Sequence, residues 1–186
     1  SIIPKIEGFK NVISSKETIS FLHYGHLGDI INSLPVIKEL SKKKKCELYI
    51  QKDKGIPKNV QSKDHPFGQV YLSENSILKI LPLLKNQKFI QKVEIYNNQK
   101  IDIDLNFFRE IPINFNIDSV RWYFHLTGCF PNLSNNYLEV PGHDKYKQYI
   151  VIMRSLRRQN KFIDYSFLKS YKNLVFIGLK DEFENL

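Results

Sequence analysis

A turn with two glycines, set between a strand pattern and a helix pattern, constrains the fold of this chain more than any other feature. Residues 18–24 are mostly apolar, aromatic or β-branched, which is typical of a buried strand. Gly25 and Gly28 follow, and apolar residues then recur at helical spacing. Residues 46–51 repeat the strand pattern, so the whole segment is expected to form a βαβ unit.

The junction between this first strand and its helix can carry chemistry. Glycines let the backbone turn sharply and approach a ligand, and the first turn of the helix presents unpaired N–H groups. Asp29 lies at this junction, where we expect an accessible carboxylate. The structural alternative for Asp29 is that it caps its own helix, which is a common role for aspartate at such a position.

Strand and helix patterns alternate through the next hundred residues. The expected elements are a helix at 76–88 interrupted by Pro82, strands at 92–96 and 101–106, and a helix that starts after Asp118 and stops at Gly128. Pro35 falls inside the first helical pattern, so either its first turn is kinked or the regular helix begins near Ser33 and Leu34. Residues 51–69 form a long irregular connection that could shape a substrate cleft. This alternation predicts an α/β domain with a largely parallel sheet.

A break at residues 141–144 (Pro-Gly-His-Asp) predicts a domain boundary. After it come an apolar run at 149–153 with the look of a buried parallel strand, a short helix at 164–171 and a strand at 173–178. We therefore expect an α/β protein with a Rossmann-like parallel-sheet domain at 1–143, followed by the start of a second Rossmann-like domain at 144–186.

Composition places the chain among globular proteins. Its 42% hydrophobic content suffices for a packed core, no apolar run has the length of a membrane span, and the N-terminus lacks the features of a secretory signal. We expect a cytoplasmic protein. Cys46 and Cys129 form neither a disulfide framework nor a metal-ligand spacing, so both are expected to be buried free thiols, which favours a reducing compartment.

The net charge of +9 is concentrated in two places. Residues 145–172 hold eight basic residues and one acid, and residues 42–45 are four consecutive lysines. The favoured interpretation of the lysine run is a solvated helix end, where cations complement the helix dipole. Its rival is contact with anionic lipid headgroups, which would place the protein peripherally at the inner face of the membrane.

The segment Gly25-His-Leu-Gly-Asp-Ile-Ile-Asn-Ser-Leu-Pro35 resembles the N-terminal signature of glycosyltransferase family 9, the relatives of ADP-heptose:lipopolysaccharide heptosyltransferases. Residues 101–105 look like the strand that ends the family's acceptor-side domain, and residues 150–155 and 175–179 look like the opening of its donor-side domain. The resemblance covers nearly all of the chain. It implies a GT-B-like fold of two facing Rossmann-like domains, of which the donor-side domain is incomplete here, as in a fragment or a shortened relative.

The resemblance also implies an activity. A sugar would pass, with inversion, from a nucleotide-sugar donor to the hydroxyl of a glycan or lipopolysaccharide-type acceptor, lipid-linked in the latter case, and no other cofactor would be required. Asp29 takes the position of the family's proposed catalytic base. Gly25, His26 and Gly28 would form the acceptor-side turn, with His26 in contact with acceptor or phosphate.

A basic turn after the strand at 149–153 is the candidate site for the donor's phosphates. Arginine pairs bidentately with phosphate oxygens, and serine or asparagine can add a hydrogen bond. The residues are Arg154, Ser155, Arg157, Arg158 and Asn160. The alternative is a solvated basic turn, and with it a non-catalytic module that binds a nucleotide or an anionic glycan.

Other classes of function fit the sequence poorly. The glycine pattern lacks the third glycine of a dinucleotide fingerprint, and no lysine follows Gly28 as in a phosphate-binding loop. His23 and His26 have no acidic or thiol partner nearby, so no metal site is expected and His23 should pack at the strand end. Trp122 and Tyr123 fit a helix core better than a sugar-stacking platform. No nucleic-acid-binding motif is present to support a nucleic-acid partner.

Overall fold

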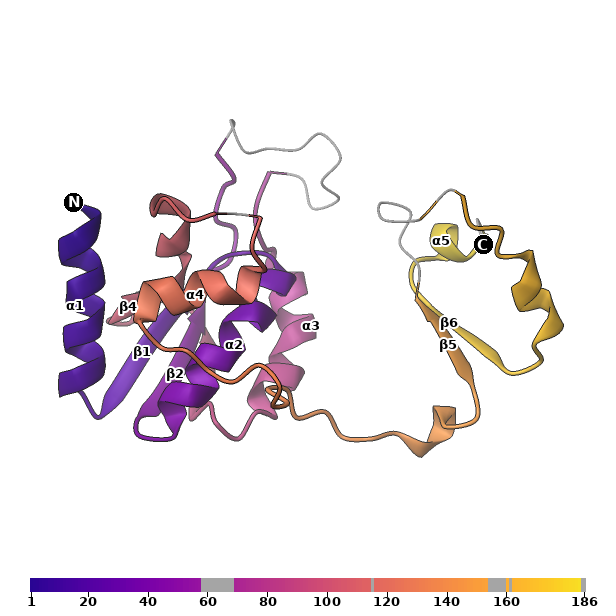
Figure 1. The fold of residues 1–186 in the computed structure, drawn as a ribbon, viewed down its shortest axis with the longest axis horizontal. Helices are drawn as coiled ribbons and strands as arrows, with labels where there is room; N and C mark the ends of the chain where they lie inside the picture. The colour runs from indigo at the N-terminus through magenta and orange to yellow at the C-terminus, as the bar shows by residue number, and fades with distance from the viewer. Residues whose placement is uncertain (58–68, 115, 154–159, 161, 185–186) are drawn as a thin grey trace. The chain divides into compact units, whose positions relative to one another are not determined.

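A computed structural model describes residues 1–57, 69–114, 116–153, 160 and 162–184. The chain divides into two compact units, Ser1–Val140 and Pro141–Leu186 (Figure 1). The division falls just before the sequence-predicted boundary at 143/144.

The first unit is a parallel α/β domain of the Rossmann-like type. Its elements, in chain order, are α1 (Ile2–Ser15), β1 (Thr18–His23), α2 (Leu27–Ser41), β2 (Lys45–Ile50), α3 (Glu74–Lys85), β3 (Lys92–Ile95), β4 (Ile103–Asp104), the 3-10 helix η1 (Leu105–Glu110) and α4 (Ser119–Thr127). The strands form one sheet in the order β3-β2-β1-β4, and every pairing in it is parallel. The predicted parallel sheet is therefore confirmed for this unit.

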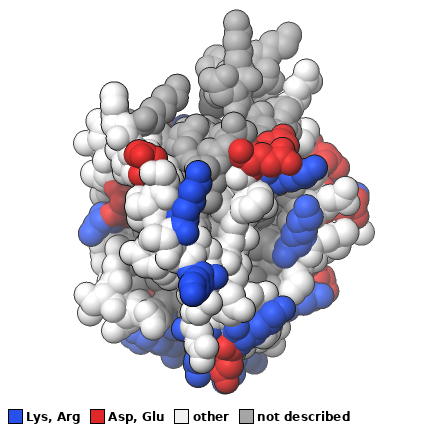
Figure 2. Space-filling view, turned by 90° about the vertical axis from the view of Figure 1, so that its right-hand side faces the viewer, with Lys and Arg blue, Asp and Glu red and all other residues white. Residues whose placement is uncertain are grey.

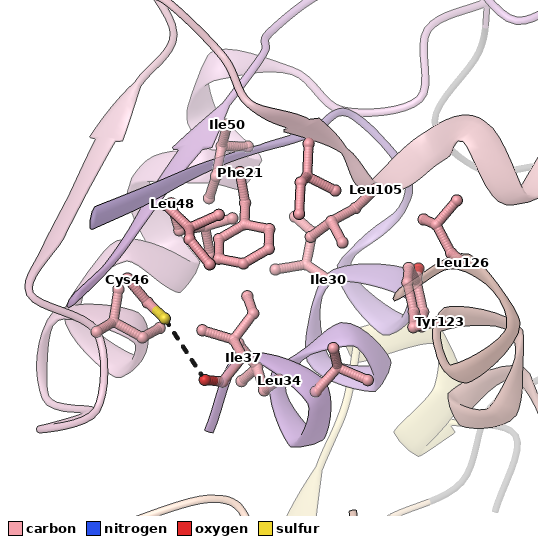
Figure 3. Close-up of a cluster of buried hydrophobic side chains, with 14 of the residues drawn as sticks. Phe21, Ile30, Leu34, Ile37, Cys46, Leu48, Ile50, Leu105, Tyr123 and Leu126 are labelled. Carbon is pink, nitrogen blue, oxygen red and sulfur yellow. Dashed lines mark hydrogen bonds between the residues drawn. The ribbon is translucent and has the colours of Figure 1, made fainter. Parts of the chain in front are cut away.

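The core lies between the sheet and the helices α2 and α4, which lie side by side (Figure 1). Phe21 of β1 pairs in register with Leu48 of β2. Figure 3 shows both side chains pointing toward Ile30 and Leu34 of α2. Tyr123 closes the core from α4 and is fully buried, so the expectation that this aromatic segment supplies helix core is confirmed for Tyr123.

Both helices that contain an internal proline run through it. α2 begins at Leu27 and continues past Pro35, so the alternative start near Ser33 and Leu34 is wrong. α3 likewise continues past Pro82. A proline removes one helical hydrogen bond, but burial of the apolar face offsets that loss. In α2, the neighbours Leu34 and Val36 are fully buried.

β4 is shorter than the strand predicted at 101–106. The strand spans only Ile103–Asp104. Asp104 ends it, because Asp104 Oδ1 accepts from the backbone N of Asn106 at 2.9 Å and from Asn106 Nδ2 at 2.7 Å. These bonds make Asp104 the N-cap of η1. Asp102 instead accepts from Ser20 and pairs with Lys16. The helix predicted at 119–128 is confirmed, with Asp118 at its N-cap and Gly128 at its C-cap at a φ of 68°.

The second unit contains η2 (Asp144–Tyr146), β5 (Ile150–Met153), η4 (Ser166–Ser170), β6 (Leu174–Ile177) and α5 (Lys180–Glu184). β5 and β6 pair in parallel, as the alternation predicts. β5 is not buried, however: Val151 is 49% exposed and Met153 is 82% exposed. The expectation of a buried strand is therefore wrong. α5 contacts β6 through the Phe183 and Phe176 rings, but β5 stays largely exposed, and the helix expected at 164–171 is only the 3-10 segment η4.

Candidate functional site

The sheet order reverses between β1 and β4, which is where open parallel sheets bind their ligands. β2 and β3 lie on one side of β1, and β4 lies on the other. The chain leaves β1 into α2 and leaves β4 into η1, so these two connections diverge from neighbouring strands. Side chains from both of them meet at this edge.

Asp29 and Arg109 form an ion pair across this switch point. Asp29 belongs to the first turn of α2, and its Oδ2 accepts from Arg109 Nη2 at 2.8 Å. The same oxygen accepts from the backbone N of His26 at 3.1 Å. The Asp29 side chain is 20% exposed and that of Arg109 is 24% exposed, so the pair is partly shielded from water.

The two oxygens of the Asp29 carboxylate therefore differ. Oδ2 has two donors and caps the start of α2, so the structural alternative describes one of the roles of Asp29. Oδ1 has no hydrogen-bond partner among the residues that the structure describes. One carboxylate oxygen thus remains for a ligand.

Three aromatic rings and an amide hold Arg109. Its guanidinium lies 4.3 Å from the ring centre of Phe108, 4.9 Å from that of Tyr71 and 5.8 Å from that of Tyr24. Nη1 donates to Asn106 Oδ1 at 3.3 Å, and the buried Asn106 is itself anchored by Asp104. Because guanidinium stacks well on aromatic faces, this setting fixes the plane of the Arg109 fork.

A buried hydrogen-bond chain fixes the backbone of the turn. The N–H of Gly25 donates to His23 Nδ1 at 3.0 Å, so the imidazole proton lies on Nε2 and is donated to Tyr123 Oη at 2.9 Å. The Tyr123 hydroxyl in turn donates to the Asp29 carbonyl at 2.9 Å. Burial, with Arg109 as the second cause, lowers the pKa of His23 to about 3, which keeps the ring neutral in this chain. Burial also raises the pKa of the Tyr123 hydroxyl.

The two glycines of the turn serve different purposes. A Cβ at Gly25 would lie 2.7 Å from Asp29 Oδ2 and 2.9 Å from Arg109 Nη2, so only glycine leaves room for the ion pair. A Cβ at Gly28 would meet nothing within 4 Å. Gly28 is exposed in the first turn of α2, and the absence of a side chain leaves that helix end open.

His26 precedes α2 as its N-cap residue and contacts Tyr71. Its Nδ1 lies 2.8 Å from the Tyr71 carbonyl, which can only accept, so Nδ1 carries a proton. The two rings are 5.3 Å apart. His26 thus links the turn to Tyr71, three residues before α3 begins, in addition to any contact with a ligand.

The residues predicted to bind the donor's phosphates lie in the second unit. Arg154, Ser155, Arg157 and Arg158 lie outside the described residues. Asn160 is described and exposed, and its Oδ1 accepts from the backbone N of Phe162 at 3.0 Å. That bond leaves the Asn160 amide group as its available donor.

The four lysines at 42–45 have local partners for the most part. Lys42 pairs with Glu39 at 2.6 Å, Lys45 pairs with Glu17 at 3.1 Å, and Lys44 donates to the carbonyl of Lys16 at 2.7 Å. On the face drawn in Figure 2, basic and acidic side chains are intermingled. Contact of this run with anionic lipid stays a prediction.

The described residues contain no group of three or more histidine, cysteine or acidic side chains that could hold a metal. In the described part of the chain, no helix is both long and apolar enough to span a bilayer. Cys46 and Cys129 are free, with Cys46 buried and Cys129 only partly so. Burial raises the pKa of their thiols to about 12 and about 11, respectively.

Sequence reasoning identified Asp29 but missed Arg109, Asn106 and the hydroxyl of Tyr123. These residues join the site from 77 or more positions further along the chain, as in the Asp29–Arg109 separation of 80 and the Asp29–Tyr123 separation of 94. The available signal was an arginine shortly after a short strand, at the carboxyl end where parallel sheets bind ligands. No protein-family model, curated protein or solved structure matches this chain.

Proposed function

We propose that the first unit is the acceptor-side domain of a sugar-transferring enzyme similar to glycosyltransferase family 9, and that Asp29 is its catalytic base. The observation that carries the proposal is that Oδ1 of Asp29, at the switch point of the sheet, has no hydrogen-bond partner within the described part of the chain. The resemblance of the turn sequence to the family signature adds to it. Gly28, in the same helical turn as Asp29, has no atom within 4 Å of where its Cβ would stand, so an acceptor could approach this helix end.

The proposed reaction is a single displacement. The acceptor hydroxyl oxygen forms a bond to the anomeric carbon, the bond from that carbon to the diphosphate oxygen breaks, and the nucleoside diphosphate leaves with the electron pair. The hydroxyl proton passes to Asp29 Oδ1. The basic residues of the second unit, Arg154, Arg157 and Arg158, would neutralise the leaving diphosphate.

The substitution Asp29→Asn tests the base. Release of nucleoside diphosphate would be followed with ADP-, UDP- and GDP-sugars as donors and rough-type lipopolysaccharide as acceptor. We expect kcat to fall by about a hundredfold or more, because asparagine cannot take the proton. The melting temperature of each variant would be measured, so that rates are compared below the unfolding range.

Asp118→Asn is the matched control. Asp118 is likewise at a helix start, as the N-cap of α4, where its carboxylate accepts from the backbone N of Arg121 at 3.3 Å, but it is exposed. Asparagine caps helices about as well as aspartate, so this variant should keep its transfer rate. A wild-type chain that releases no more diphosphate than Asp29→Asn would refute the proposed function.

A non-catalytic binding module is the second candidate. The two donors on Asp29 Oδ2 favour it, because they give this carboxylate a complete structural role as a helix cap and ion-pair partner. In that case a nucleoside diphosphate would bind without turnover, and Asp29→Asn would leave its affinity unchanged. Replacing Arg154, Arg157 and Arg158 together by glutamine would abolish the binding measured by calorimetry.

A further inference from the structure

Arg109 occupies a place in the site that neither the turn sequence nor the proposed base explains. Its guanidinium contacts elements on both sides of the switch point: Asn106 after β4 and Asp29 in α2. Through Asn106 it is linked to Asp104, the last residue of β4. A continuous series of hydrogen bonds therefore runs from the end of one strand to the helix that follows its neighbour.

Every member of this series is fixed by a further contact. Asn106 is 1% exposed, and its Oδ1 also accepts from the backbone N of Tyr24 at 3.0 Å. The Arg109 guanidinium stacks over Phe108 and Tyr71, which are both buried. An arginine with so little rotational freedom loses little entropy when it binds a carboxylate.

The rigid Arg109 side chain contacts only one oxygen of the Asp29 carboxylate. Arg109 Nη2 and the N–H of His26 approach the same carboxylate oxygen, Oδ2, and not one oxygen each. The carboxylate is thereby held from one side, and Oδ1 keeps its lone pairs. Without Arg109, a single backbone N–H would remain on the carboxylate, and either oxygen could take it.

We propose that Arg109 is the positioning residue of this site: it holds Oδ2 of Asp29 so that Oδ1 is the oxygen presented to the ligand. For catalysis this inference rests on the proposed function, because orientation of a base matters only if the base reacts. The orientation itself is a property of the ion pair and can be tested without any activity.

The first test is a double-mutant cycle in stability with Asp29→Asn and Arg109→Met, using urea unfolding. The two effects should be non-additive, with a coupling of about twofold to a hundredfold in the unfolding equilibrium constant. The control cycle uses Asp118→Asn and Arg121→Met, an exposed ion pair three residues apart on α4. Coupling at Asp29–Arg109 no larger than in this control cycle would overturn the inference.

The second test separates positioning from ligand binding. In the transfer assay, Arg109→Met should lower kcat about tenfold or more with little change in KM, and the double variant should be no slower than Asp29→Asn alone. Arg109→Lys, which keeps the charge but loses the planar fork, should fall between wild type and methionine. Millimolar guanidinium should restore part of the rate of Arg109→Met and none of that of Asp29→Asn.

The outcomes distinguish the two proposals. A raised KM with unchanged kcat would make Arg109 a ligand contact and overturn its positioning role. If the wild-type chain transfers no sugar, the proposed function fails, and the stability cycle alone decides whether Arg109 orients the carboxylate. If Arg109→Met does not fold, Arg109→Lys replaces it in both tests.

Discussion

Gly25 shows how closely the atoms of this site are packed at the scale of single residues. Its backbone N–H donates to His23, and the space beside its Cα is taken by the ends of the Asp29 and Arg109 side chains. Among the described glycines only Gly128 has a positive φ, so Gly25 is required by this close approach and not by its backbone angles. The Asp29–Arg109 pair thus requires a residue without a Cβ at position 25.

The substitution Gly25→Ala should disrupt the ion pair. Its Cβ would stand 2.7 Å from Asp29 Oδ2 and 2.8 Å from His23 Cε1, and the buried His23 ring has no room to retreat. Overpacking of this kind costs about 1–3 kcal/mol of unfolding free energy. Urea unfolding measures the loss, and an unchanged midpoint would show that the turn tolerates a methyl group.

Gly28→Ala is the matched control on the same turn. It meets nothing within 4 Å, and alanine in a first helical turn is neutral or stabilises by up to about 1 kcal/mol. If an acceptor approaches this helix end, the same variant should transfer sugar more slowly while its stability is kept. The pair of glycines thereby separates folding from ligand access.

His23 makes the stability of the folded chain depend on pH, and the sign of that dependence follows from its pKa. Its pKa lies at about 3 in the folded chain, against an ordinary value of 6.5, chiefly because the ring is buried. Between pH 6.5 and pH 3 the unfolded chain binds a proton at His23 that the folded chain does not. The free energy of unfolding is therefore unaffected by this histidine above pH 6.5 and decreases as the pH falls from 6.5 toward about 3. The slope approaches about 1.4 kcal/mol per pH unit.

The slope is measured by urea unfolding at a series of pH values in wild type and in His23→Gln. The glutamine variant should be less stable near neutral pH and should lose less stability on acidification. His125→Gln, on the exposed face of α4, should keep the wild-type slope. Equal slopes in wild type and His23→Gln would show that the burial of His23 does not govern the response.

At the scale of elements, local signals predict most helices and strands, while their ends depend on tertiary contacts. The capping residues Asp118 and Gly128 mark α4 correctly in the sequence. Pro35 is a misleading signal, because burial of the apolar face of α2 outweighs one missing hydrogen bond. β4 is predicted too long because the alternating aspartates around it bind their own surroundings: Asp102 binds Ser20, and Asp104 caps η1.

The candidate site divides in the same way. Asp29 is predictable from the sequence because its neighbours define a strand, a turn and a helix over a short stretch. Arg109 and Tyr123 are not, since their contacts with Asp29 depend on which strand lies beside β1 and on how α4 packs on α2. Strand order is a property of the whole sheet, and one sequence carries little direct information on it.

At the scale of the whole molecule, the two units differ in what supports them. The first has a parallel sheet with a buried core between strands and helices. The second has a two-stranded parallel sheet whose apolar side chains are largely exposed, with Ile150 at 44% and Ile177 at 55%. A parallel pair of this kind contributes little stability by itself, because parallel strands are normally covered on both faces.

The first unit should therefore carry the cooperative stability of the chain. A truncated chain of residues 1–140 should unfold in one transition. Its melting temperature should lie within about 3 °C of that of the full chain, because the second unit adds little to the free energy of unfolding. The end point is set by Gln87, which is fully buried, donates to the Glu139 carbonyl at 3.0 Å and accepts from the Glu139 N–H at 2.8 Å. Truncation at 129 would remove both bonds between Gln87 and Glu139, leaving the Gln87 amide its bond to the Leu83 carbonyl, and would remove Leu133 and Leu138 from the core, so this shorter chain should melt several degrees lower. A 1–140 chain that unfolds without cooperativity would show instead that the first unit does not fold independently.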